Sequence, residues 1–182
     1  MSDNTINFKE ERAIFVNEEL TIEGAGKFVQ MMYHMSENSA DPIFIVINSK
    51  GGNIRALMTM ISAIEVANCD ITTIDVGCAA SCAAILFLQG KKRLIVKGAE
   101  IMFHQPLQKF SNDLYSYSEI VEIKEALKKD YEFFITEFIS KTNFTRKKII
   151  SKIKNKNYVL GCDEALKTGV ATQIISSVSE LK

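Results

Sequence analysis

The 182-residue sequence lacks the marks of several protein classes. Lysine plus arginine and aspartate plus glutamate each number 22, so no excess charge points to a nucleic-acid or membrane surface. No apolar run is long enough to span a bilayer. The first residues carry no basic region leading into an apolar run, so no secretory signal is expected. These absences favour a cytoplasmic protein whose partners are proteins or peptides.

Cysteine and proline are also scarce. The four cysteines, Cys69, Cys78, Cys82 and Cys162, have neither the density of a disulfide scaffold nor the clustering of a zinc site. We therefore expect reduced cysteines that pack as small residues, with no bound metal and no cofactor. The two prolines lie beside apolar runs, and no flexible linker divides the chain.

Apolar residues, 47% of the chain, suffice for one substantial core. Short β-rich runs alternate with segments of helical period, which predicts an α/β architecture. The strand-like runs cover residues 13–16, 43–49, 71–76, 94–96 and 101–103.

Three segments show the periodicity of amphipathic helices. The longest, 114–139, carries enough aromatic bulk to pack against another subunit as well as its own core. His34 ends the first segment, and we expect it at the surface rather than in a site. The apolar faces comprise Ala25, Phe28, Val29 and Met32; Ile54, Leu57, Met58, Ile61 and Ile64; and Ile120, Ile123, Leu127, Phe134 and Phe138.

Three short motifs carry the candidate chemistry. Gly51-Gly52 follows a strand and precedes a helix, where glycines allow close approach of the backbone and expose amide donors. Ser81 lies among small residues in 77–84, and His104 follows within 101–106. A hydroxyl becomes a nucleophile when a neighbouring base takes its proton, so this pair suits nucleophilic catalysis. Each motif alone also has a purely structural explanation: the glycines could form a turn, Ser81 could be a small packing residue and His104 could be a core histidine.

In their order and separations these motifs resemble those of the proteolytic subunit of Clp protease. The matching segments are Ile47-Asn48-Ser49-Lys50-Gly51-Gly52, Gly77-Cys78-Ala79-Ala80-Ser81-Cys82-Ala83-Ala84 and Met102-Phe103-His104-Gln105-Pro106. The resemblance implies a crotonase-like α/β fold with repeated β-β-α units and a long protruding handle helix. It implies a single domain over 12–182 after a short N-terminal segment, 1–11.

The resemblance also implies roles for single residues. Ser81 would be the nucleophile at a helix start and His104 the general base. The backbone N–H groups of Gly52 and Cys82 would form the oxyanion hole. The family's third catalytic residue is an aspartate, and Asn157 occupies that position without a gap.

An asparagine in the third position predicts slow turnover. The Asn157 carbonyl could fix the tautomer of the imidazole, but it offers no negative charge to the imidazolium that forms. Asp163 follows six residues later, and we expect it to cap the next helix rather than to replace the missing aspartate. The predicted triad is therefore Ser-His-Asn.

Three other departures from the family pattern concern assembly and substrate binding. Asn155-Lys156 stands where the family carries Asp-Arg, whose charges help couple stacked rings. The segment 107–112 has no glycine, whereas the family has a glycine-rich strand that holds extended substrate. The segment before Arg12 is shorter than the family's usual axial gate.

The resemblance implies a serine endopeptidase in ring-shaped homo-oligomers, heptamers that could stack into tetradecamers. These rings would degrade unfolded polypeptides delivered by an AAA+ unfoldase. An alternative is a catalytically weak or inactive structural or regulatory subunit that assembles with an active paralogue. A third hypothesis is an acyl-CoA enzyme of the crotonase fold, although such an enzyme needs no Ser-His pair.

Overall fold

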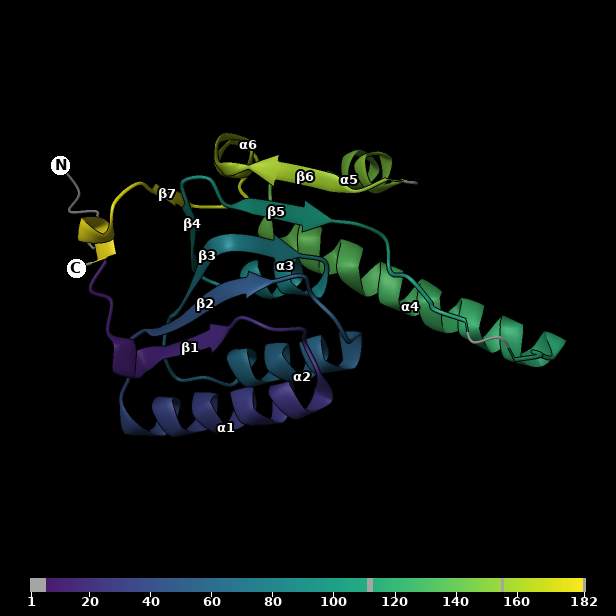
Figure 1. Cartoon of the computed structure of the whole chain (residues 1–182), viewed down its shortest axis with the longest axis horizontal. Coiled ribbons are helices and arrows are strands. Elements are labelled where there is room, and N and C mark those ends of the chain that lie inside the picture. Colours follow the sequence, from purple (N-terminus) through teal and green to yellow (C-terminus); the bar gives the residue numbers. More distant parts are fainter. Residues whose placement is uncertain (1–5, 111–112, 155, 182) are drawn as a thin grey trace.

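The computed structural model describes residues 6–110, 113–154 and 156–181. Asn155 and residues 111–112 of the segment after Pro106 lie outside these ranges, as do residues 1–5 of the N-terminal segment. Strands and helices alternate along the chain (Figure 1). In order they are β1 (Ala13–Val16), α1 (Ile22–Asn38), β2 (Ile43–Ser49), α2 (Ile54–Glu65), β3 (Ile71–Ala80), α3 (Cys82–Phe87), β4 (Lys92–Val96), β5 (Glu100–Phe103), α4 (Tyr117–Lys141), α5 (Arg146–Ile153), β6 (Tyr158–Gly161), α6 (Cys162–Lys167) and β7 (Gln173–Ile175), with 3₁₀ turns at Glu10–Arg12 and Val178–Leu181.

The predicted mixed α/β fold is confirmed. All five strand-like runs are strands, and the long helical segment forms α4. The apolar faces of the first two helices turn inward, although Val29 of α1 and Ile54 of α2 are only half-buried. Met58 of α2 is only half-buried, and Met60 is buried in its place. The buried stripe of α2 is wide because this helix packs against both α1 and α3.

The sheet has seven strands and divides at β3. Strands β1, β2, β3, β4 and β7 lie side by side and are parallel. The first part of β3 pairs with β4 through Thr72–Asp75, whereas its last residues, Cys78–Ala80, pair with β5. Strand β6 then adds to β5 in antiparallel orientation. The end of β3 therefore lies beside β5 instead of β4.

The two faces of the sheet are covered differently. Helices cover one face, and the larger apolar cluster lies between them and the strands (Figure 1). The other face carries a smaller cluster that includes Ile6, Phe44 and Ile74. There the two ends of the chain meet, since the Phe8 N–H donates to the Leu181 carbonyl at 3.2 Å. The terminal segments thus complete the core.

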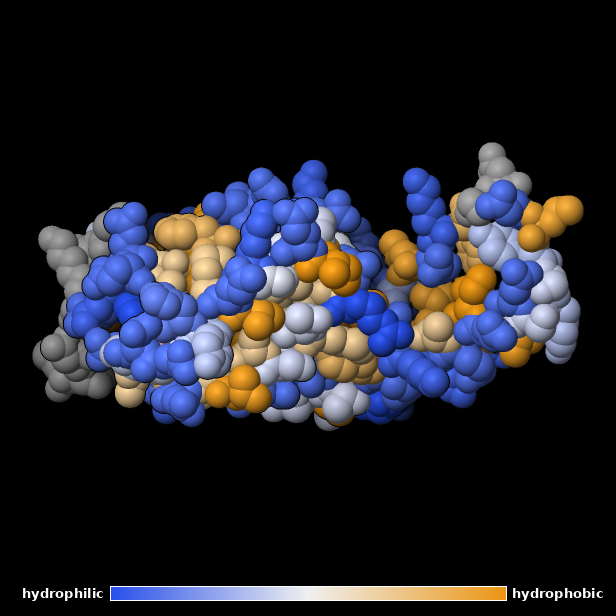
Figure 2. Space-filling view, turned by 90° about the horizontal axis from the view of Figure 1, so that it is seen from below, coloured by the Kyte–Doolittle hydropathy of each residue, from blue (hydrophilic) through white to orange (hydrophobic). Residues whose placement is uncertain are grey.

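Helix α4 extends beyond the body of the molecule (Figure 1). Its C-terminal half is anchored by Phe134 and Phe138, which are 6% and 2% exposed. In its first half Ile120 is 52% exposed, and Leu114 just before the helix is fully exposed. Hydrophobic surface shows on this projecting end in the space-filling view (Figure 2). Only half of the predicted apolar line therefore meets the core of the same chain.

A buried carboxylate lies at an irregularity of β3. The pairing with β2 shifts between Ile47, opposite Asp75, and Ser49, opposite Ala79, so β3 bulges between these points. Asp75 is fully buried, and its Oδ1 accepts from the Gly77 N–H at 3.1 Å. Its Oδ2 has no hydrogen-bond partner among the described residues. Burial raises the pKa of Asp75 to about 7.

Asp75 should make the protein less stable as the pH rises. Because its folded pKa lies above that of the unfolded chain, the folded state holds the extra proton between about pH 4 and pH 7. The free energy of unfolding should therefore fall across this interval, by an amount that approaches roughly 4 kcal/mol. Asp75→Asn keeps an acceptor for the Gly77 N–H and should remove this fall, as measured by urea unfolding at several pH values.

The exposed variant Glu122→Gln serves as the control and should keep the wild-type pH profile. A wild-type profile in Asp75→Asn would contradict this account of the buried carboxylate.

Candidate active site

Three strand ends bring the predicted catalytic residues together. Ser81 follows β3, and its N–H donates to the Met102 carbonyl of β5 at 2.8 Å. His104 directly follows β5. Asn157 directly precedes β6, whose Tyr158 pairs with Phe103, so the same register continued by one residue sets His104 opposite Asn157. Sheet topology thus gathers residues that are far apart in sequence.

Ser81 occupies a sharp turn between β3 and α3. Its φ is 56° and its ψ is −122°. Among the described residues it is the only one other than glycine that has a positive φ. Such a backbone conformation costs energy and is typical of functional sites, including the nucleophile turns of hydrolases. The Ser81 carbonyl accepts from the Ala84 N–H at 3.1 Å, which starts helix α3. The prediction of a serine at a helix start is confirmed.

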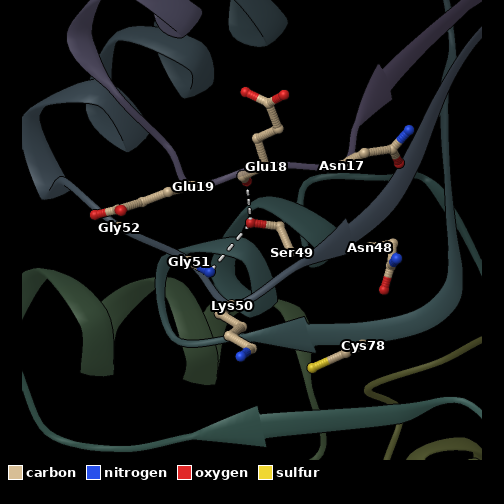
Figure 3. A pocket seen from close by; sticks show the side chains of 9 residues that line it. All are labelled: Asn17, Glu18, Glu19, Asn48, Ser49, Lys50, Gly51, Gly52 and Cys78. Atoms are coloured by element: carbon tan, nitrogen blue, oxygen red, sulfur yellow. Dashed lines mark hydrogen bonds between the residues drawn. The ribbon is translucent and has the colours of Figure 1, made fainter.

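The glycine pair packs directly against this turn. Gly51 has a φ of 93°, and a Cβ there would lie 2.6 Å from the Ala80 carbonyl oxygen and 2.9 Å from Ser81 Cβ. Figure 3 shows how Ser49 holds the pair in place. Its hydroxyl donates to the Glu18 carbonyl at 2.5 Å and accepts from the Gly51 N–H at 3.1 Å. Only glycine permits so close an approach to Ser81.

The two predicted oxyanion donors are joined by a thiol. The Cys82 Sγ donates to the Gly52 carbonyl at 3.2 Å. The Leu20 N–H donates to the Gly51 carbonyl, and the Leu20 carbonyl accepts from the Asn53 N–H. These bonds lie on either side of Gly52 and do not use the Gly52 N–H. The Cys82 N–H begins α3, where the first amides have no partner within the helix. Burial raises the pKa of Cys82 to about 11, so its thiol stays protonated and can donate.

His104 has a backbone partner rather than a triad partner. Its Nδ1 lies 2.5 Å from the Gln105 carbonyl oxygen, and because a carbonyl can only accept, Nδ1 carries the proton. Nε2 is then the basic nitrogen. Asn157 is exposed, and among the described residues no hydrogen bond joins His104 to Asn157 or to Ser81. Ser81 and His104 line the same cavity, whereas Asn157 is not among the residues that line it.

Ser81, His104 and both oxyanion residues line one cavity of about 390 Å³. Its remaining walls come from the start of α2, from the segment after β5 and from helix α4, which contributes Leu127, Asp130 and Phe134. Sequence reasoning missed Asp130, because one charge on a helix surface carries no signal of its own. It also missed the Gln105 carbonyl, since a backbone acceptor has no residue signature. Asp163 is exposed in the first turn of α6, but it does not cap the helix, because Gly161 is the N-cap residue and no side-chain cap hydrogen bond is present there.

The arrangement of strands and this site define the fold of the Clp peptidases. A structure of an asparagine-to-aspartate mutant of ClpP1 from Listeria monocytogenes matches with a TM-score of 0.84. The match covers 95% of this chain and 96% of that one at 23% sequence identity, which shows the fold.

Sequence comparison extends this result from fold to family. The family model described as Clp protease matches residues 1–178, so the chain belongs to the Clp protease family. It is 35% identical over 178 residues to the ATP-dependent Clp protease proteolytic subunit 2 of Prochlorococcus marinus (strain NATL2A), covering 93% of this chain and 85% of that protein. The proteolytic subunit of Mesostigma viride is 30% identical over 175 residues, covering 94% and 74%. Family membership supports a protease role.

The thiol contact yields a test of the oxyanion geometry. Cys82→Ala removes the donor to the Gly52 carbonyl, whereas Cys82→Ser retains one. Because such a bond contributes on the order of 0.5–1.5 kcal/mol, we expect the alanine variant to react with a fluorophosphonate roughly 2- to 10-fold more slowly at Ser81. The serine variant should react near the wild-type rate, as followed by intact mass.

Cys162→Ala is the matched control, because this thiol also donates to a carbonyl, that of Val96 at 3.4 Å, away from the cavity. Equal rates for Cys82→Ala and Cys82→Ser would contradict a role for the thiol proton.

Proposed function

We propose that this chain is a serine-type endopeptidase subunit with Ser81 as nucleophile, His104 as general base and Asn157 as third residue. The observation that carries the proposal is the convergence of β3, β5 and β6, which sets Ser81 and His104 in one cavity beside two backbone amides. With a proton on Nδ1, His104 leaves Nε2 to act as the base, which is the tautomer that a general base requires. Unfolded polypeptide in extended form is the proposed substrate.

The proposed reaction follows the usual course of acyl transfer. The Ser81 Oγ attacks the carbonyl carbon of the scissile bond while its proton passes to His104 Nε2. The N–H groups of Gly52 and Cys82 donate to the oxyanion that forms. His104 then returns the proton to the leaving amine, and water hydrolyses the acyl-enzyme with the same groups in the same roles.

The proposed assembly is a ring in the cytoplasm, a homo-oligomeric heptamer that stacks into a tetradecamer and receives substrate from an AAA+ unfoldase. The half-exposed α4 supports it, because Leu114, Tyr117 and Ile120 are apolar side chains that the core of the same chain does not cover. Hetero-oligomers with a paralogue would use the same surface. The relatives named above are protease subunits, which argues against an acyl-CoA enzyme.

A catalytically weak ring subunit is the second candidate, and the state of His104 favours it. The Nδ1 proton is engaged by the Gln105 carbonyl, and no negative charge of the described triad positions faces the imidazole. Such a subunit would gain full activity only when an active paralogue completes the ring. Activity that appears only on mixing with the paralogue would support this candidate.

Covalent labelling tests whether Ser81 is activated. We expect wild-type protein to gain one fluorophosphonate adduct by intact mass, because the probe needs an activated hydroxyl and no particular peptide. Ser81→Ala and heat-denatured wild type should gain none. A native wild type without adduct would favour the weak-subunit candidate, and an adduct on Ser81→Ala would exclude Ser81 as the nucleophile.

Restoring the missing charge tests the third position. Asn157→Asp places a carboxylate opposite His104, where it can stabilise the imidazolium formed in the transition state. The reverse change costs about 10⁴ in a well-aligned triad, so we expect peptide turnover to rise at least about tenfold. Lys156→Gln changes the net charge by the same amount without facing His104 and should leave turnover unchanged. Equal turnover in wild type and Asn157→Asp would exclude residue 157 as the partner of His104.

A further inference from the structure

The cavity that holds Ser81 and His104 also contains a carboxylate without a partner. Asp130 of α4 lines this cavity and is half-buried. Among the described residues no ion pair or hydrogen bond engages its side chain. Its charge nevertheless acts inside the site, because it opposes ionisation of the Cys82 thiol.

The helix itself offers Asp130 no cation. On a helix surface the neighbours of a residue lie three and four positions away. For Asp130 these are Ala126, Leu127, Phe133 and Phe134, all apolar. The adjacent Lys128 and Lys129 are exposed and do not share its face. A carboxylate in these surroundings has lost part of its hydration without gaining a counter-ion, so a cation from elsewhere would be bound favourably.

The walls around Asp130 suit a particular kind of side chain. Leu127 and Phe134 flank it on α4. Ile54 of α2, with Pro106 and Leu107 after β5, adds further apolar surface to a cavity that polar side chains also line. Lysine and arginine carry an aliphatic stem that packs on apolar surface and a cationic head that needs an anion. A carboxylate beyond an apolar wall meets both requirements.

We propose that Asp130 makes this cavity a binding site for a lysine or arginine side chain of the substrate, next to the bond that Ser81 attacks. The proposal rests on the peptidase function proposed above and adds the substrate class. Asp130 is a specificity residue: it contacts the substrate side chain and takes no part in proton transfer. The enzyme therefore cleaves after basic residues in preference to apolar residues of the same length.

A matched pair of substrates tests this specificity. Two internally quenched peptides differ only at the residue before the cleaved bond, lysine in one and norleucine in the other, which have similar stems and differ by the ammonium group. Two peptidyl diphenyl phosphonates with the same two residues report the preference without turnover, since Ser81 Oγ displaces one phenoxide from phosphorus. Rates are measured for the assembled wild type, Asp130→Asn and the exposed control Glu122→Gln.

We expect wild type and Glu122→Gln to prefer lysine over norleucine about tenfold or more in kcat/KM and in phosphonate rate, as a charge-assisted contact implies. Asp130→Asn should lose this preference, so that its rates with lysine and norleucine become similar. The preference of wild type should also decrease with added salt.

Equal rates for both side chains in wild type, or a preference that survives in Asp130→Asn, would overturn this inference and leave the proposed function standing. A wild type that reacts with neither phosphonate nor with a fluorophosphonate would overturn both.

Discussion

The bulge in β3 is the constraint on which the site depends. Up to Asp75 the strand pairs with β4, and from Cys78 onward it pairs with β5. The carboxylate of Asp75 holds the bulge by accepting from the Gly77 N–H. Without this change of partner the strand would end beside β4, and Ser81 could not donate its N–H to Met102, two residues before His104. This change of partner therefore brings Ser81 and His104 to the same edge of the sheet.

Several features around this bulge lower the stability of the folded protein. One oxygen of Asp75 has no hydrogen-bond partner among the described residues of the core, and Ser81 has a positive φ. Gly51 lies so close to Ser81 that a side chain at position 51 would not fit. Each feature costs free energy and persists only because the surrounding strands fix it. The features cluster within one strand end and the turn packed on it, where they set the position of the Ser81 hydroxyl. Strain at this point is typical of a functional site rather than of a simple structural turn.

Sequence patterns predicted most of the fold and proposed the residues of the candidate site, for physical reasons. A run such as Ile43–Ser49 is apolar almost throughout because both faces of β2 are buried. Strands β6 and β7 were not predicted, because β6 runs directly into helix α6 and β7 has only two apolar residues, so neither stands out as a separate β-rich run. The serine and histidine were found from motifs. The proton acceptor of His104 was not, because a backbone carbonyl leaves no trace in the residue types, and Asp130 looks like any surface charge until the fold turns it toward Ser81.

Helix α4 has two roles: one part lines the cavity, and the other projects from the molecule. Its C-terminal half is anchored in the core by Phe134 and Phe138, and Asp130 and Leu127 of the same helix line the cavity that holds Ser81 and His104. Its N-terminal half extends past the sheet with apolar residues exposed. Because a helix is stiff over a few turns, any contact that covers the exposed half also acts on the position of the half that lines the cavity. Assembly through the projecting end would therefore shape the wall of the substrate site, and not only hold neighbouring subunits together.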